Sequence, residues 1–160
     1  MQTTWILVGD SSRARIIEQH GVNGALQEIE DFINPAGRTT GNEFAADHQG
    51  QFHGKGERFQ QHAAEPAVAA HEHATELFAK SLTEYLEHAN GEHRFHHLRL
   101  VAAPKFLGLI RASLGKELER AVSESLDREI ASWSLAEIET YLRDRRETGG
   151  VPLGSAPAAA

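Results

Sequence analysis

Residues 37–62 read GRTTGNEFAADHQGQFHGKGERFQQH, and this stretch divides the chain into two halves of different pattern. It holds five glycines and no apolar run long enough for a helix or a strand, which predicts a long loop. Most connections in compact domains have about 4–6 residues, so a loop of roughly 25 residues is expected to be functional or disordered. The half before the loop favours strands, and the half after it alternates between helix and strand.

Three strands are predicted before the loop. Residues 5–8 (WILV) form a continuous apolar run, which is typical of a strand buried on both faces. After a turn at residues 9–12, residues 13–16 alternate polar and apolar side chains, so the two segments are expected to pair as a hairpin. Residues 25–32 have helix-like apolar spacing, but their length and flanking turns favour a strand with a β-bulge.

The second half is predicted to begin with a helix that has Pro66 in its first turn. Its apolar side chains fall on one stripe at 100° per residue. The residues of the stripe are Ala67, Ala74, Phe78, Leu82, Tyr85 and Ala89. A buried strand over residues 97–103 and a short helix from Pro104 come next. An edge strand at 122–130 and a last helix that begins with a Ser134–Glu137 capping box complete the order.

The element order is therefore β-β-β, long loop, α-β-α-β-α. Three antiparallel strands followed by alternating helices and strands predict an α/β fold with a ribonuclease H-like mixed sheet. Residues 1–147 are expected to form a single domain with a flexible loop at 37–62. Residues 148–160, which are rich in glycine, proline and alanine, are expected to be a disordered tail.

The composition restricts the possible classes of protein. Of the 160 residues 40% are hydrophobic and 24% charged, as in an ordinary soluble domain, and the lack of cysteine excludes a disulfide framework. The N-terminus has no signal-peptide pattern and no apolar run approaches about 20 residues, so a cytoplasmic protein without a membrane partner is expected. A formal net charge of -7 argues against a general nucleic-acid coat protein, and DNA is not expected as a partner.

Ten histidines and an acidic residue after the first strand raise the question of a metal site. His71 and His73 are two residues apart and do not share a helix face, so His71 is expected to lie in the core or to contact a loop. Asp10 stands where ribonuclease H-like nucleases hold a metal ion, but the sequence Asp10-Ser11-Ser12 favours a turn. No metal and no cofactor is therefore expected, and a metal-dependent nuclease is the least favoured alternative.

Four segments together resemble a known family over about residues 3–146. They are TTWILVGDSSRARI (3–16), the glycine-rich loop, LRLVAAPKFLGLIRASLGKELERAV (98–122) and SLAEIETYL (134–142). They resemble the bacterial host-attachment protein family, whose members are usually named as required for attachment to host cells. That family is similar in fold to the central domain of archaeal and eukaryotic class-1 release factors. In those proteins the equivalent loop carries a Gly-Gly-Gln motif that helps water attack peptidyl-tRNA.

The resemblance implies candidate site residues in the loop. Gly50 and Gln51 match the last two residues of the motif and are the candidate catalytic residues, whereas Gln49 replaces the first glycine. A Gln side chain is able to hold a water and stabilise an oxyanion. The candidates for RNA contact are Arg38, Gln49, Lys55 and Arg58. The alternatives are a chance Gly-Gln pair and a solvated loop.

The leading expectation is a binding domain that acts in translation, with ribosomal RNA or tRNA as its partner. Its role would be ribosome rescue, a termination-like reaction or hibernation, and binding without catalysis is favoured over peptidyl-tRNA hydrolysis. The alternative from another class is a factor that supports attachment to host cells, in an indirect way.

Overall fold

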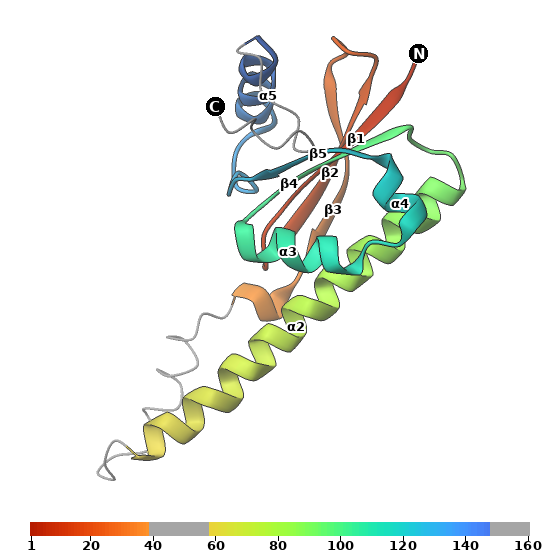
Figure 1. Ribbon diagram of the computed structural model, residues 1–160. Coiled ribbons are helices and arrows are strands. Elements are labelled where there is room, and N and C mark those ends of the chain that lie inside the picture. Colours follow the sequence, from red (N-terminus) through yellow and green to blue (C-terminus); the bar gives the residue numbers. More distant parts are fainter. Residues whose placement is uncertain (39–57, 148–160) are drawn as a thin grey trace, which may run out of the picture.

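The fold is given by a computed structural model, which describes residues 1–38 and 58–147. Five strands form one mixed sheet in the order β3-β2-β1-β4-β5 (Figure 1). The strands are β1 Thr3–Gly9, β2 Arg13–His20, β3 Leu26–Ile33, β4 His97–Ala102 and β5 Val122–Asp127. The helices are η1 Pro35–Arg38, α2 Arg58–Gly91, α3 Pro104–Ser113, α4 Lys116–Ala121 and α5 Leu135–Glu147. The predicted α/β class is confirmed at this level.

The strand pairing divides the sheet into an antiparallel and a parallel part. β1, β2 and β3 pair antiparallel, which confirms the predicted hairpin, and β4 and β5 run parallel to β1. The pairing of β2 with β3 shifts between Ile16, which faces Glu30, and Ile17, which faces Glu28. Ile29 is thus the additional residue on β3, and the predicted bulge is present. β5 lies at the edge of the sheet, as expected.

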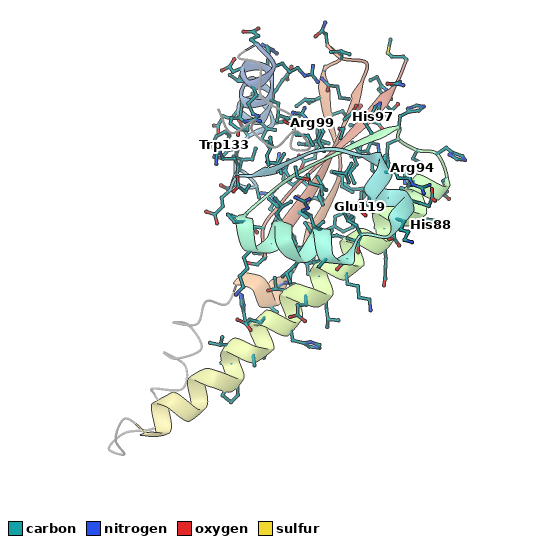
Figure 2. All side chains as sticks on the ribbon, viewed as in Figure 1. His88, Arg94, His97, Arg99, Glu119 and Trp133 are labelled. Atoms are coloured by element: carbon teal, nitrogen blue, oxygen red, sulfur yellow. The ribbon has the colours of Figure 1, made fainter. Side chains whose placement is uncertain are left out.

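Helices cover both faces of this sheet. α2, α3 and α4 lie on one face and α5 on the other (Figure 1). The chain reaches β4 just after α2, where Figure 2 shows Arg94 near the end of that helix. Its guanidinium carbon lies 4.8 Å from the centroid of the Trp5 ring, a cation–π contact that closes this end of the core. Among the described residues, no helix is both long and apolar enough to cross a membrane.

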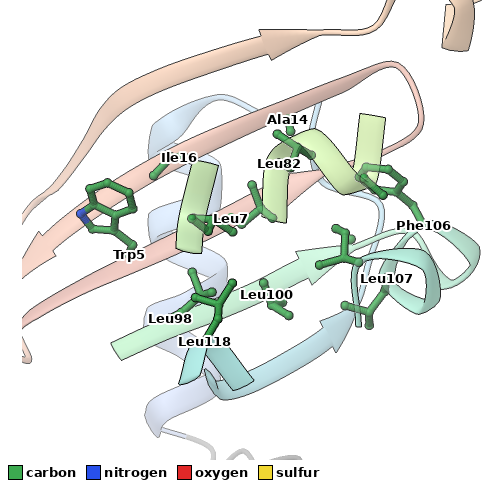
Figure 3. Packing of buried hydrophobic residues seen from close by; sticks show 14 of the residues in the cluster. Trp5, Leu7, Ala14, Ile16, Leu82, Leu98, Leu100, Phe106, Leu107 and Leu118 are labelled. Atoms are coloured by element: carbon green, nitrogen blue, oxygen red, sulfur yellow. The ribbon is translucent and has the colours of Figure 1, made fainter. Parts of the chain in front are cut away.

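The core has two layers because β1 is buried on both faces, as its apolar run predicts. Trp5 and Leu7 pack against α2, α3 and α4 (Figure 3), whereas Ile6 and Val8 pack against α5. Burial of alternate side chains on opposite faces follows from the two-residue period of a strand. On α2, the predicted stripe is confirmed, with Leu82 fully buried.

The beginning of α2 corrects the predicted loop boundaries. The helix starts at Arg58, so Pro66 lies inside it and not in its first turn, and the preceding 3-10 helix extends to Arg38. The expected loop at 37–62 is therefore helical at both ends. Ala63, Ala64 and Glu65 are strong helix formers. In a helix of 34 residues, one backbone hydrogen bond lost at a proline is a small part of the total.

The capping of α5 leads to a first prediction. The backbone N–H of Glu137 donates to Ser134 Oγ at 3.2 Å, which is half of the predicted capping box. Ser134→Ala leaves that donor without its partner, so the free energy of unfolding should fall by about 1 kcal/mol in a denaturant titration. Ser81→Ala, in the middle of α2, is the control and should be neutral or slightly stabilising because alanine is the better helix former. Equal losses in both variants would contradict the assigned cap.

Candidate anion-binding site

A cavity of about 620 Å³ lies between the sheet and the C-terminal end of α5. Its walls come from the N-terminal ends of the three parallel strands, from the turn after β2 and from the last turn of α5. The charged or titratable side chains that line it are His97, Arg99, Glu124, Arg145 and Arg146. Figure 2 shows His97 and Arg99 on β4, at the end of the molecule where α5 and the N-terminus lie.

The strand period explains how the sequence builds this cavity. Val101 on β4 and Leu126 on β5 pack under α5 in the second core layer. Two residues earlier on the same face stand Arg99 and Glu124, which are register partners across the two strands. The α5 face of the sheet therefore changes from apolar to charged toward the N-terminal ends of these strands.

One carboxylate joins two arginines in the cavity. Glu124 Oε2 accepts from Arg99 Nε at 2.8 Å and lies 2.6 Å from Arg99 Nη2. Glu124 Oε1 lies 3.3 Å from Arg145 Nη2. The Arg99 side chain is 9% exposed and that of Glu124 15%, so this is a buried arrangement in which each charge depends on the others.

Arg146 attaches α5 to the turn after β2. Its Nη2 donates to Gln19 Oε1 at 3.0 Å, and its Nη1 donates to the carbonyl oxygen of Val22. Burial lowers the pKa of Arg146, the positive charge of Arg99 lowers it further, and the negative charge of Glu124 opposes both. A guanidinium nevertheless stays protonated in proteins. The side chains of three arginines and one glutamate thus line the cavity, with a formal charge of +2 among them.

A second cavity, of about 290 Å³, lies at the carboxyl ends of β1 and β4. Asp10 lines it, but Asp10 Oδ1 accepts hydrogen bonds from Ser12 N (2.8 Å), Ser12 Oγ (2.8 Å) and Arg13 N (2.9 Å). Its predicted role as a turn residue is therefore confirmed. Within residues 1–38 and 58–147, no group of three or more histidine, aspartate or glutamate side chains is placed to hold a metal ion.

His71 also lines this second cavity, where it contacts the 3-10 helix η1 and not the predicted loop at 37–62. His71 Nδ1 lies 3.1 Å from the carbonyl oxygen of Ala36, so the side chain connects α2 to η1. Gly37 of η1 lies so close to the turn after β1 that a Cβ there would be 1.9 Å from the Ser11 carbonyl oxygen. These contacts hold η1 against α2 and against the turn after β1.

The site residues predicted from the resemblance are not brought together by the described part of the chain. The candidate catalytic residues Gly50 and Gln51 lie outside it, as do Gln49 and Lys55. The backbone of Arg38 ends η1 and that of Arg58 begins α2. All of these roles stay predictions.

The residues that line the cavity are not among the candidates predicted from the sequence. Arg99 stands inside the run HLRLVAA, whose apolar pattern predicts a buried strand. A charged residue in a buried strand needs a buried partner of opposite charge. The position of Arg99 was therefore the signal in the sequence that could have indicated a charged site. Arg145 and Arg146 are adjacent in the last turn of α5, where a basic pair also fits the helix dipole. Their approach to Arg99 depends on long-range packing.

A family model described as "Protein required for attachment to host cells" matches residues 5–142. No curated protein matches the chain. The leading expectation, a ribosome- or tRNA-associated role in translation, is wrong on this finding, because the matching family is described by host attachment, which was the alternative. The chain belongs to the family of proteins required for attachment to host cells.

Proposed function

We propose that this chain supports the attachment of its bacterium to host cells. The observation that carries this proposal is the family match over residues 5–142, which spans nearly the whole described fold. The match includes Arg99 and Glu124 and ends three residues before Arg145. A family description applies to the domain as a whole, so the proposal concerns the domain and not one residue.

We propose that the chain acts as a binding domain in this role. The cavity beside α5 supports this, because its charged groups are paired with one another and held in place, as binding groups are in preformed sites. A cytoplasmic location, with an indirect effect on attachment, remains part of the proposal and is tested by fractionating cells that express the tagged full chain.

The finer fold assignment is also a proposal. The order β3-β2-β1-β4-β5, with β4 and β5 parallel to β1, supports a ribonuclease H-like sheet. A likeness to the central domain of class-1 release factors is proposed for the fold alone. It implies no reaction, because unrelated functions share folds of this kind.

Deletion of the gene should reduce the number of bacteria that remain attached to cultured host cells after washing. A plasmid that encodes the full chain should restore attachment, and the empty plasmid should not. Growth rate in medium without host cells is the control, and it should be unchanged. Equal attachment by the deletion strain and its parent, at equal growth, would overturn the proposed function.

A further inference from the structure

We propose that the cavity beside α5 binds small organic phosphate monoesters, with Arg99, Arg145 and Arg146 as the groups that hold the phosphate. This inference goes beyond the role in host attachment and does not depend on it. Binding by the purified chain can be present or absent whatever the attachment phenotype is.

The charge of the cavity matches a dianion. Glu124 is the one carboxylate among the residues that line it, against three guanidinium groups, so the lining side chains carry a formal charge of +2. A phosphate monoester carries a charge of about −1.5 to −2 at pH 7 and brings three acceptor oxygens. A monocarboxylate would neutralise only half of the excess.

Arg15, which is buried as Arg99 is, shows the contacts of an arginine with a structural role. Arg15 donates to both oxygens of Glu28 (2.6 and 3.2 Å) and to the carbonyl oxygens of Ala131 (3.1 Å) and Trp133 (2.5 Å). One carboxylate therefore serves one guanidinium. In the cavity, Glu124 pairs with the guanidinium groups of both Arg99 and Arg145, and Arg146 lies beside them. The cavity therefore gathers three guanidinium groups around one space, whereas Arg15 stands alone with its carboxylate.

The cavity arginines are oriented before a ligand arrives. Glu124 engages Nε and Nη2 of Arg99, which leaves Nη1 for a ligand, and only 8% of this residue is exposed. Gln19 and the Val22 carbonyl fix the guanidinium of Arg146. Arginine binds phosphate through parallel N–H···O bonds, and little ordering entropy is lost when the side chains are already held.

The rest of the cavity suits an organic group and a small ligand. Its volume of about 620 Å³ exceeds what a bare phosphate fills and lies within the range of about 300–1,000 Å³ of small-molecule sites. Met1 (98% exposed) and Val22 (72% exposed) are among its lining residues and offer apolar contacts. The net charge of -7 on the whole chain disfavours a long polyanion such as RNA, whereas a single dianion meets only the local positive field.

Isothermal titration of the full chain tests this inference. Glucose 6-phosphate, glucuronate and glucose form a matched series with a dianion, a monoanion and no charge on the same sugar. The phosphate ester should bind at least about tenfold more tightly than glucuronate, since each charge-assisted hydrogen bond contributes a tenfold factor or more. Glucose should give no heat. Ribose 5-phosphate, AMP and inorganic phosphate show how much the organic group contributes.

Arg145→Gln should weaken binding of the phosphate ester by about tenfold or more. Arg120→Gln is the matched control, because it removes one positive charge from an exposed pair with Glu117 on α4, and it should bind as the wild type does. Arg145→Lys keeps the charge without the planar fork and should bind with intermediate affinity. Circular dichroism verifies that each variant is folded. If Arg145→Gln is unfolded, the affinity of Arg145→Lys for the ester is the deciding measurement.

Three results would overturn the inference. The first is no binding of any of the three esters at millimolar concentration. The second is binding of glucuronate as tight as that of glucose 6-phosphate. The third is equal affinity of the ester for the wild type and for a folded Arg145 variant.

Discussion

Arg15→Met is expected to lower the free energy of unfolding by about 3 kcal/mol, the range measured when one partner of a buried ion pair is removed. The Arg15 side chain is 5% exposed and connects β2 to β3 through Glu28. It also donates to the carbonyl oxygens of Ala131 and Trp133, in the segment between β5 and α5. Methionine retains the apolar stem but leaves these acceptors without a donor, and buried acceptors without partners are destabilising.

Arg13→Met is the control for this change. Arg13 stands on the same strand, two residues away, and pairs with Asp31 on β3 at 3.1 Å, but the two side chains are 36% and 44% exposed. An exposed pair of this kind contributes about 0–1 kcal/mol. Urea titration followed by circular dichroism should therefore separate the two variants clearly. Similar losses for Arg13→Met and Arg15→Met would show that burial of the Arg15 network does not matter.

Fluorescence gives a second measurement on the Arg15 variant. The chain has two tryptophans, of which Trp5 is fully buried and Trp133 is 36% exposed. Since Arg15 holds the carbonyl of Trp133, quenching by acrylamide should increase in Arg15→Met under native conditions, through greater access to Trp133. Unchanged quenching would mean that the segment before α5 is held by other contacts.

Local sequence patterns predict the strands and most helices of this protein well. The run at residues 5–8 predicts β1 because only a central strand buries side chains on both faces, and the structure confirms it. The irregular phase of residues 25–32 predicts the bulge, which lies at Ile29. Ser134 predicts the start of α5 because its oxygen meets a backbone donor three residues on. Each of these features leaves a signal within a few consecutive residues, although the burial of β1 and the bulge are completed by packing and strand pairing.

Features that depend on distant residues were not predictable in this way. The local preference of proline predicts that a helix starts at Pro66, but α2 starts eight residues earlier, at Arg58. The cavity needs Arg99 on β4, Glu124 on β5 and Arg145 on α5 in one place. Only the parallel register of β4 and β5 sets Arg99 opposite Glu124. A sequence pattern indicates that Arg99 needs a partner, but the partner is chosen by tertiary packing.

The functional error has a different origin. The resemblance identified the family, and the match over residues 5–142 confirms that part. The translation role was taken from a likeness in fold and from the dipeptide Gly50-Gln51. A dipeptide is too short to carry a specific signal, and fold does not determine function. The family description points to host attachment instead.

Glu124→Gln is expected to lower the free energy of unfolding by about 2–3 kcal/mol, because it leaves Arg99 buried without its counter-ion. The amide still accepts one hydrogen bond, so the loss should be smaller than complete removal of the side chain. The charge of the cavity rises from +2 to +3 with this change, and the arginines repel one another more strongly. Glu117→Gln is the control, because the Glu117 side chain is exposed on α4, and it should change stability by less than about 1 kcal/mol.

The same variant connects stability to the proposed ligand. Loss of the competing carboxylate should strengthen binding of an anion, so glucose 6-phosphate should raise the melting temperature of Glu124→Gln more than that of the wild type. Potassium chloride at equal ionic strength separates specific binding from screening, because screening acts on both proteins alike. If Glu124→Gln is destabilised and chloride restores it as well as the ester does, then Glu124 is a structural counter-ion and the cavity holds no phosphate. A larger shift with the ester would place the bound phosphate beside Arg99 and Arg145.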